Sequence, residues 1–475
     1  MGKNEPLQQW EQKKQELQQG NSEKIKIQHD KGKKTARERI GLLFDTVSFV
    51  ELEALNEDSG VICGYGLAEN RPVFAVAQDV TVKGAAMSKA QAGKIIRTLD
   101  LAKKSGSPVV FFIDTEGFQV EENALALKAY GKVFAKMASL SGFCPTISLV
   151  SGNSFGVAAQ FAAIADFTIV TEGISTMLPF SPAVMNTAGN VPKDAETLGG
   201  AKLLSIEGIA ALVTASEEEA IGSTKKLLGL IPSSTSEEAP YVNSDDINRT
   251  ITADGSSGLA LADDIADKGT RLELYKDAGI GMHTSFARIG GHSCLLIVSE
   301  PINNNGRLCH KACKKISRLV DFADNYNLPV VSLVSSEGLK VVPEDKLPTL
   351  MANCAEMTNH ISWASIPKVS VIYGNAIGAS YISFVASANP DISFVWPHSM
   401  VAPLSKETAV QTFDALKLKS EKRSTLEAAY AKAHDGMSVA QLGLVDNIIN
   451  PSETRKHIIA AIELLYTKDR AFQFD

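Results

Sequence analysis

Short apolar segments alternate with longer helical segments along the chain. Runs of β-branched and aromatic residues at 109–114, 146–150 and 166–170 predict buried strands. Between them, residues 88–106 and 124–141 carry apolar side chains at helical spacing. This alternation predicts βαβ units, an α/β fold in which a largely parallel sheet is covered by helices.

The same pattern of strands and turns occurs twice. PVVFFIDTEGF begins at Pro108, and its counterpart PVVSLVSSEGL begins at Pro329. The segment 144–161 likewise matches the segment 366–384, with glycines at corresponding positions. A segment rich in Ser, Pro and acidic residues, IPSSTSEEAPYVNSDD, lies between the copies. We therefore predict two tandem domains of one kind, at residues 1–240 and 241–475.

Each copy places two glycine turns directly after predicted strands. The first copy has them at 116–118 and 156, and the second copy has them at 337–339 and 378. A glycine lets the backbone approach a ligand closely, and free N–H groups at the start of a helix favour negative charge. Such turns suit a developing oxyanion or a phosphate, although packing and turn geometry alone also explain glycine at these positions.

One of these turns also fits the nucleophile motif G-x-S-x-G, with Ser154 at its centre. This match makes a serine hydrolase an alternative function. The second copy keeps the glycines and the asparagine but has Ala376 in place of the serine. None of the eight histidines stands in a recognisable triad setting. The comparison favours the backbone of the turn, rather than the hydroxyl, as the functional element.

Composition narrows the class of protein. The net charge of −7 argues against a protein that binds nucleic acid. The chain has no long uninterrupted apolar run that could span a membrane and no apolar signal segment at its start, so we expect a cytoplasmic protein. Its six cysteines form no C-x-x-C pair, and Cys309, His310 and Cys313 are interpreted as helix residues. No metal is predicted.

Five segments together resemble the carboxyltransferase subunit of biotin-dependent acyl-CoA carboxylases. This family includes the β chains of propionyl-CoA and acetyl-CoA carboxylases and the related decarboxylase subunits. The resemblance rests on residues 35–52, 64–95, 198–221, 286–301 and 391–404, and it extends over nearly the whole chain. It implies two tandem crotonase-like domains, each a ββα superhelix.

The resemblance also implies a function. A carboxyl group would pass between carboxybiotin and a short-chain acyl-CoA of the acetyl or propionyl type. The N-terminal domain would bind acyl-CoA, and the C-terminal domain of a neighbouring subunit would face biotin, at a dimer interface of a homo-oligomer. The chain has no biotin-attachment MKM and no ATP-grasp signature. Biotin would therefore arrive on a biotin carboxyl carrier protein, with biotin carboxylase or decarboxylase subunits as partners. The alternative within the fold is a scaffold subunit that binds CoA esters.

The resemblance assigns the catalytic role to backbone N–H groups. One oxyanion hole, for the thioester enolate, falls on Gly156 and Val157. The other, for the ureido oxygen of biotin, falls on Gly378, Ala379 and Ser380. The residues expected to bind substrate are Gly84, Ala85, Gly117, Phe118, Gly338 and Leu339.

The chain departs from the family pattern near these turns. Val157 stands where the family has a second glycine, and it adds bulk. Glu116 and Glu337 lie in loops that have lost a glycine, together with an arginine in the first loop and a proline in the second. A carboxylate so close to an anion site would repel the anion unless it faces away.

Overall fold

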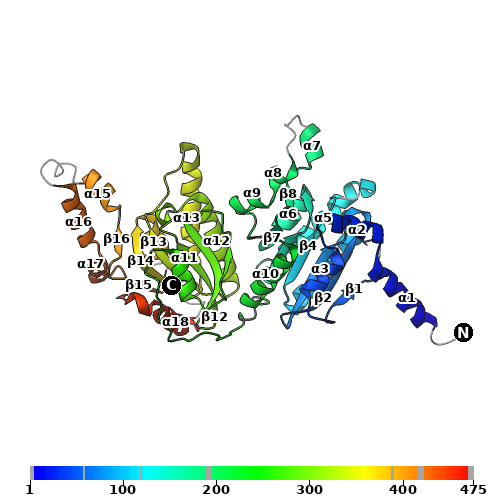
Figure 1. Ribbon diagram of the computed structural model, residues 1–475, viewed down its shortest axis with the longest axis horizontal. Coiled ribbons are helices and arrows are strands. Elements are labelled where there is room, and N and C mark those ends of the chain that lie inside the picture. Colours follow the sequence, from blue (N-terminus) through cyan, green and yellow to red (C-terminus); the bar gives the residue numbers. More distant parts are fainter. Residues whose placement is uncertain are drawn as a thin grey trace. The chain divides into compact units, whose positions relative to one another are not determined.

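The computed structural model describes residues 5–56, 59–117, 120–187, 194–386, 390–413 and 422–468. The chain divides into two compact units, Met1–Glu237 and Glu238–Asp475. Each unit is a mixed α/β structure built on one large sheet (Figure 1). The two sheets have corresponding strand orders, as the sequence repeat predicts.

The sheet of the N-terminal unit has the order β1-β2-β3-β4-β5-β7-β9. Its first three strands pair antiparallel, and the following pairs are parallel. A separate parallel pair joins β6 to β8. The strands are β1 Val50–Leu52, β2 Val61–Ala68, β3 Arg71–Gln78, β4 Val109–Ile113, β5 Thr146–Val150, β6 Asn153–Phe155, β7 Phe167–Thr171, β8 Thr176–Leu178 and β9 Leu212–Thr214.

The helices of this unit begin and end at recognisable caps. Thr35 and Glu38 form the capping box of α3, and Ser88 caps α4, which ends at Gly106 in the left-handed conformation. The two helices predicted at 88–106 and 124–141 are confirmed as α4 and α5. The helices are α1 Glu5–Gln19, α2 Ser22–Asp30, α3 Ala36–Leu43, α4 Lys89–Ser105, α5 Ala124–Ala138, α6 Val157–Ala163, α7 Pro182–Thr187, α8 Ala195–Gly199, α9 Ala201–Ile206 and α10 Glu217–Leu230.

The C-terminal unit follows the same plan, with the order β10-β11-β12-β13-β14-β15-β17 and with β16 paired to β14. Helices α12 and α13 pack against each other in this unit (Figure 1). Its strands are β10 Leu272–Leu274, β11 Met282–Ile289, β12 His292–Ser299, β13 Val330–Ser336, β14 Lys368–Ile377, β15 Ile392–Val395, β16 Met400–Ala402 and β17 Asn447–Ile448. Its helices are α11 Gly258–Ile265, α12 His310–Asn325, α13 Leu347–Trp363, α14 Ala379–Phe384, α15 Lys406–Phe413, α16 Arg423–Ala433, α17 Gly436–Gln441 and α18 Thr454–Leu465.

Each unit contains a buried ion pair that joins two segments far apart in the sequence. In the N-terminal unit, Arg39 of α3 binds Glu217 of α10 at 2.6 Å and Asp114 at 3.3 Å. In the C-terminal unit, Arg455 of α18 binds Asp267 at 2.5 Å, with both side chains fully buried. Buried pairs of this kind destabilise a fold strongly when one partner is removed, so each fixes an early segment of its unit to a late one.

Candidate functional site

Three backbone segments of the N-terminal unit converge where β4 and β5 end. The amide of Glu116 donates to the carbonyl of Gly84 at 2.9 Å, and the amide of Met87 donates to Gly117 at 2.8 Å. The amide of Thr115 reaches the carbonyl of Asn153 at 3.5 Å. These bonds bring the predicted turns at 84, 117 and 156 into one cluster.

The C-terminal unit repeats this convergence. The amide of Glu337 donates to Asn305 at 3.1 Å, and the amide of Leu308 donates to Gly338 at 2.9 Å. Ser380 Oγ, at the start of α14, lies 3.2 Å from the carbonyl oxygen of Ser336 and 2.9 Å from that of Ile377. Equivalent backbone contacts therefore hold equivalent turns in both copies.

The segment at Gly84 adopts an unusual conformation. Lys83, Gly84 and Ala85 all have positive φ, at 51°, 63° and 47°. Residues 304–306 of the second copy do the same, at 59°, 54° and 63°. Left-handed residues other than glycine carry a conformational cost of about 1–3 kcal/mol each. Both copies have this turn, and in each copy it accepts a hydrogen bond from the loop that contains the glutamate. We infer that the turn fixes the position of that loop.

Gly156 and Gly378, which the sequence suggests as amide donors, each donate their N–H group to a neighbouring strand. Gly156 has φ 61° and ψ −126°, and its N–H donates to the carbonyl of Leu178 at 2.8 Å. Gly378 has φ 51°, and its N–H donates to Ala402 at 3.0 Å. Each of these two N–H groups is therefore bonded to a neighbouring strand, and their place in an oxyanion hole stays a prediction. The glycines instead provide the positive φ that turns the chain into the helix.

The first two backbone N–H groups of α6 and of α14 are available to a ligand. Within the described chain, the N–H groups of Val157 and Ala158 donate to no protein acceptor, and the same holds for Ala379 and Ser380. The first N–H groups of any helix lack partners inside the helix, so a ligand can accept from them. Val157 packs its side chain against the N-terminal core, which directs its bulk into the protein. Ala158 is a donor that the resemblance did not assign.

The remaining predicted residues differ in their surroundings. Ala85 is fully buried, and its carbonyl accepts from Gln91 and Thr115, so it helps to hold the turn in place. Gly117 and Gly338 lie in the loops beside the two helix starts, while Leu339 is partly exposed. Phe118 lies outside the residues that the structure describes.

Ser154 is poorly placed to act as a nucleophile. It lies in β6 and is fully buried, and its Oγ has no hydrogen-bond partner among the described residues. A nucleophilic serine must reach the substrate and must be bonded to a base. The structure therefore gives no support to the serine-hydrolase alternative.

The two loop glutamates are held differently. Glu337 Oε1 accepts from Asn375 Nδ2 at 2.6 Å, which ties this carboxylate to β14. Glu116 lines a cavity of about 220 Å³ together with three lysines of the N-terminal segment. These lysines are Lys24, Lys31 and Lys33. Sequence reasoning missed them, although the density of lysine between residues 24 and 34 was a visible signal.

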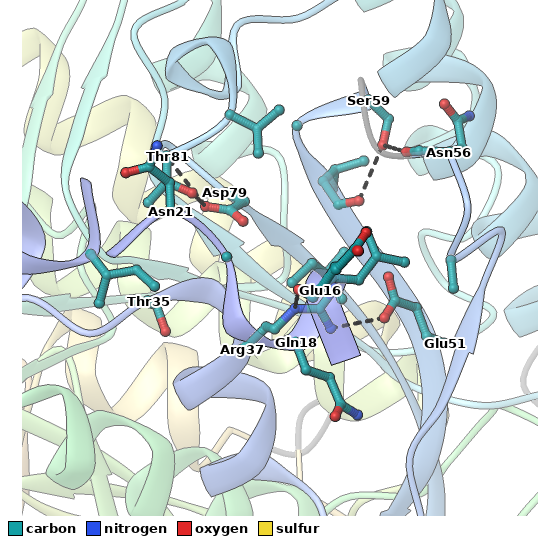
Figure 2. Close-up of a pocket in the computed structure, with 18 of the residues that line it drawn as sticks. Glu16, Gln18, Asn21, Thr35, Arg37, Glu51, Asn56, Ser59, Asp79 and Thr81 are labelled. Atoms are coloured by element: carbon teal, nitrogen blue, oxygen red, sulfur yellow. Dashed lines mark hydrogen bonds and ion pairs between the residues drawn. The ribbon is translucent and has the colours of Figure 1, made fainter. Parts of the chain in front are cut away.

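A larger cavity of about 430 Å³ lies between α1 and the sheet of the same unit (Figure 2). Arg37 donates to Glu51 at 2.9 Å and to the carbonyl of Leu17 at 3.0 Å inside it. Neither Gly156 nor Val157 is among the residues that line it. This cavity is therefore a feature separate from the glycine turns.

The carboxyl transferase domain family matches this chain over residues 27–474. The chain belongs to the carboxyl transferase domain family. The match covers both units, so the family resemblance in the sequence is confirmed, and the protein is a carboxyltransferase.

Relatives and solved structures agree with this assignment. The chain is 31% identical to the methylmalonyl-CoA decarboxylase subunit alpha of Veillonella parvula, over 94% of this chain and 93% of that protein. It is 30% identical to the methylmalonyl-CoA carboxyltransferase 12S subunit of Propionibacterium freudenreichii subsp. shermanii, over 94% and 92%. The crystal structure of a transcarboxylase 12S hexamer with methylmalonyl-CoA bound superimposes with a TM-score of 0.93. That comparison has 29% identity and covers 99% of this chain and 97% of the other.

No helix in the described part of the chain combines the length and the apolar character needed to cross a bilayer. In the same ranges, no three His, Cys, Asp or Glu side chains gather closely enough to hold a metal ion.

Proposed function

We propose that this carboxyltransferase moves a carboxyl group between a short-chain acyl-CoA and biotin held on a separate carrier protein. The observation that carries the proposal is the repeated pair of unbonded amides at 157–158 and 379–380, in a chain that matches the family over nearly its full length. The two units would then be tandem crotonase-like domains, the first binding acyl-CoA and the second facing biotin.

In this proposal, the amides of Val157 and Ala158 donate to the thioester oxygen of acyl-CoA. Negative charge develops on that oxygen when the α-carbon loses its proton, and preorganised N–H donors stabilise it. Glu116 lies in the neighbouring loop, where the lysine-lined cavity partly offsets its charge. The same lysines suit the phosphate groups of CoA.

The second pair of amides suits the ureido oxygen of biotin. That oxygen is a hydrogen-bond acceptor, and the amides of Ala379 and Ser380 are donors without a protein partner in the described ranges. The Ser380 hydroxyl donates to Ile377 at 2.9 Å, which keeps it bonded to the protein. When bound, carboxybiotin supplies the carboxyl group and a ureido nitrogen that accepts the α-proton. The protein contributes position and electrostatic stabilisation, with no side-chain nucleophile.

Exposed apolar side chains beside both turns support an active site at a subunit interface. Phe180 and Val184 follow β8, the strand that accepts from Gly156, and they are 58% and 54% exposed. Ile382 lies in α14 and is 56% exposed. Large exposed apolar groups near a site mark a surface that another molecule covers. We propose that a second copy of the chain covers them, in a cytoplasmic homo-oligomer that works with a biotin carboxyl carrier protein and biotin carboxylase or decarboxylase subunits.

The second candidate is a scaffold subunit that binds CoA esters without turnover. The glutamates in both loops favour it, because a carboxylate opposes negative charge that develops nearby. Calorimetric titration of the purified protein with propionyl-CoA and methylmalonyl-CoA, paired with a transfer assay on a biotinylated carrier, separates the candidates. Binding with transfer supports the carboxyltransferase, binding without transfer supports the scaffold, and absence of binding contradicts both.

A further inference from the structure

Three of the six cysteines gather where two helices of the C-terminal unit pack together. Cys309 immediately precedes α12, Cys313 lies one turn into that helix, and Cys354 lies in α13. The side-chain amide of Asn353 donates to the carbonyl of His310 at 3.0 Å, which holds this part of α13 against the first turn of α12. None of these thiols takes part in the proposed carboxyl transfer.

Two of the three thiols face each other across the contact between the helices. The thiols of Cys313 and Cys354 are hydrogen-bonded, and both cysteines are in the free form. The sulfur atoms of a disulfide are about 2 Å apart, so two thiols in direct contact need only a small movement to form one. Cys313 is buried, whereas Cys354 is partly exposed. A reagent from solution therefore meets Cys354 first.

The contact also makes the two thiols chemically different. The hydrogen bond from Cys313 lowers the pKa of the Cys354 thiol against the opposing effect of burial, and the hydroxyls of Thr358 and Ser383 lower it further. The hydrogen bond to Cys354 and burial raise the pKa of Cys313, so the proton stays on the buried sulfur. Because the thiolate is the nucleophile, Cys354 is the reactive member of the pair.

Cys354 also contacts the helix that follows the second glycine turn. Its thiol is hydrogen-bonded to Ser383 of α14, and the Ser383 hydroxyl lies 2.7 Å from that of Thr358 in α13. Ser383 lies three residues after Ser380, whose N–H is one of the two available amides at the start of α14. A chemical change at the Cys354 sulfur therefore alters a direct contact with α14.

We propose that Cys354 is a site of reversible oxidation, at which hydrogen peroxide joins Cys354 to Cys313 in a disulfide. The Cys354 thiolate attacks one peroxide oxygen, the O–O bond breaks, and the released hydroxide takes up a proton to become water. The Cys313 sulfur then attacks the sulfenic acid on Cys354, so that an S–S bond forms and the S–O bond breaks. The departing hydroxide leaves with the Cys313 proton as a second water. Thiol exchange reverses the bond.

The disulfide draws the Cys354 sulfur towards α12 and weakens its contact with Ser383. A displacement of about 1 Å in a catalytic group can lower a rate by about 10²-fold. We therefore expect the oxidised protein to transfer carboxyl groups about tenfold more slowly, or slower still. Its affinity for propionyl-CoA should not change, because the proposed acyl-CoA site lies in the other unit. This effect on transfer rests on the proposed function, whereas the disulfide does not.

The test treats the full chain with equimolar hydrogen peroxide and maps its cysteines by mass spectrometry of unreduced peptides. We expect two peptides joined through Cys313 and Cys354, lighter by two hydrogens than the separate peptides, and separated again by dithiothreitol. Cys354→Ser should abolish this pair. Cys309→Ser is the matched control, because it removes the third cysteine of the cluster, and it should give the same pair as the wild type.

A second measurement needs no variant. Iodoacetamide should label Cys354 of the reduced wild-type protein at neutral pH faster than Cys63 and Cys144, because burial raises the pKa of each of those two thiols to about 12. The proposal is overturned if no disulfide forms, if Cys354 pairs with Cys309, or if Cys63 or Cys144 is labelled as fast as Cys354.

Carboxyl transfer is measured on the same samples. The rate should fall on oxidation and recover with dithiothreitol, and an unchanged rate in the presence of the disulfide would overturn the predicted effect on α14. If the reduced wild-type protein transfers nothing, the proposed function fails while the mapped disulfide still decides whether Cys354 is an oxidation site.

Discussion

Proline at position 157 tests the role of a single backbone amide. Val157 is the first residue of α6, and its N–H has no protein acceptor in the described structure. Val157→Pro therefore removes the proposed donor without breaking a helical hydrogen bond, and proline is favoured at this helix position. The preceding residue also permits it, because Gly156 at φ 61° and ψ −126° mirrors the extended conformation preferred before proline.

The expected effect can be estimated from the number of donors. In the proposed function, Val157 would supply one of two amides to the thioester oxygen. Removal of one oxyanion donor typically lowers kcat by about 10²–10³-fold, or about 2.7–4 kcal/mol. The melting temperature should change little, since proline keeps a side chain of similar size against the core. Val157→Ala is the matched control, because it keeps the N–H and shortens the side chain.

The assay is steady-state transfer from methylmalonyl-CoA to a biotinylated carrier, with melting temperatures measured on the same preparations. We expect a large fall in kcat for Val157→Pro and a small change for Val157→Ala. A folded Val157→Pro enzyme with wild-type kcat would refute the reasoning. An equal loss in both variants would refute it as well, since the side chain would then be responsible.

Four further changes have definite expected outcomes. Ala379→Pro should lower transfer by about 10²-fold while leaving calorimetric affinity for propionyl-CoA unchanged, and Ala379→Gly should remain active. Arg39→Met leaves buried Glu217 without its cation and leaves Asp114 paired with Lys33 alone. It should lower the free energy of unfolding in urea by about 3–5 kcal/mol, whereas a loss as small as that of the partly exposed Arg37→Met would contradict the buried pair. Ser154→Ala should transfer carboxyl at the wild-type rate, and a fluorophosphonate probe should not label the wild type; labelling at this serine would restore the hydrolase reading. Burial lowers the pKa of Lys315 from 10.5 to about 8, so the folded chain loses this proton before the unfolded chain does. Stability should then rise with pH between those values, and Lys315→Met should flatten that rise in urea titrations at pH 8 and pH 10.

Local signals in the sequence were sufficient for most of the fold. The capping box at Thr35 and Glu38 and the apolar spacing of 88–106 specify helices through contacts within a few residues. The internal repeat predicted two tandem domains, because corresponding segments recur at a nearly constant separation along the chain. These features depend on neighbours along the chain, which a single sequence displays directly.

The sequence indicated the two turns but not which of their backbone amides are bonded to neighbouring strands. A glycine turn shows where the chain bends, but it does not show which N–H groups a neighbouring strand will consume. The carbonyls that accept from Gly156 and Gly378 belong to Leu178 and Ala402, each in a strand that follows the helix opened by the glycine. The amides without a protein acceptor among the described residues are those of Val157 and Ala158 in the first unit and of Ala379 and Ser380 in the second, and only Ala158 was absent from the sequence prediction.

Long-range charge pairs were also beyond sequence reasoning. Arg39 and Glu217 are 178 residues apart in the sequence, and the strands of the sheet lie between them along the chain. Lys94 and Glu51 could have been noticed, because the repeat places Lys315 and Glu273 at equivalent positions.

Transfer of a labelled carboxyl group tests the central claim most directly. Methylmalonyl-CoA carrying ¹⁴C in its free carboxyl group is incubated with the purified chain and a biotinylated carrier, without ATP. We predict that label appears on the carrier, that it disappears when propionyl-CoA is added, and that Val157→Pro and Ala379→Pro each slow its appearance. A carrier that stays unlabelled, under conditions in which the transcarboxylase 12S subunit labels it, would contradict the account.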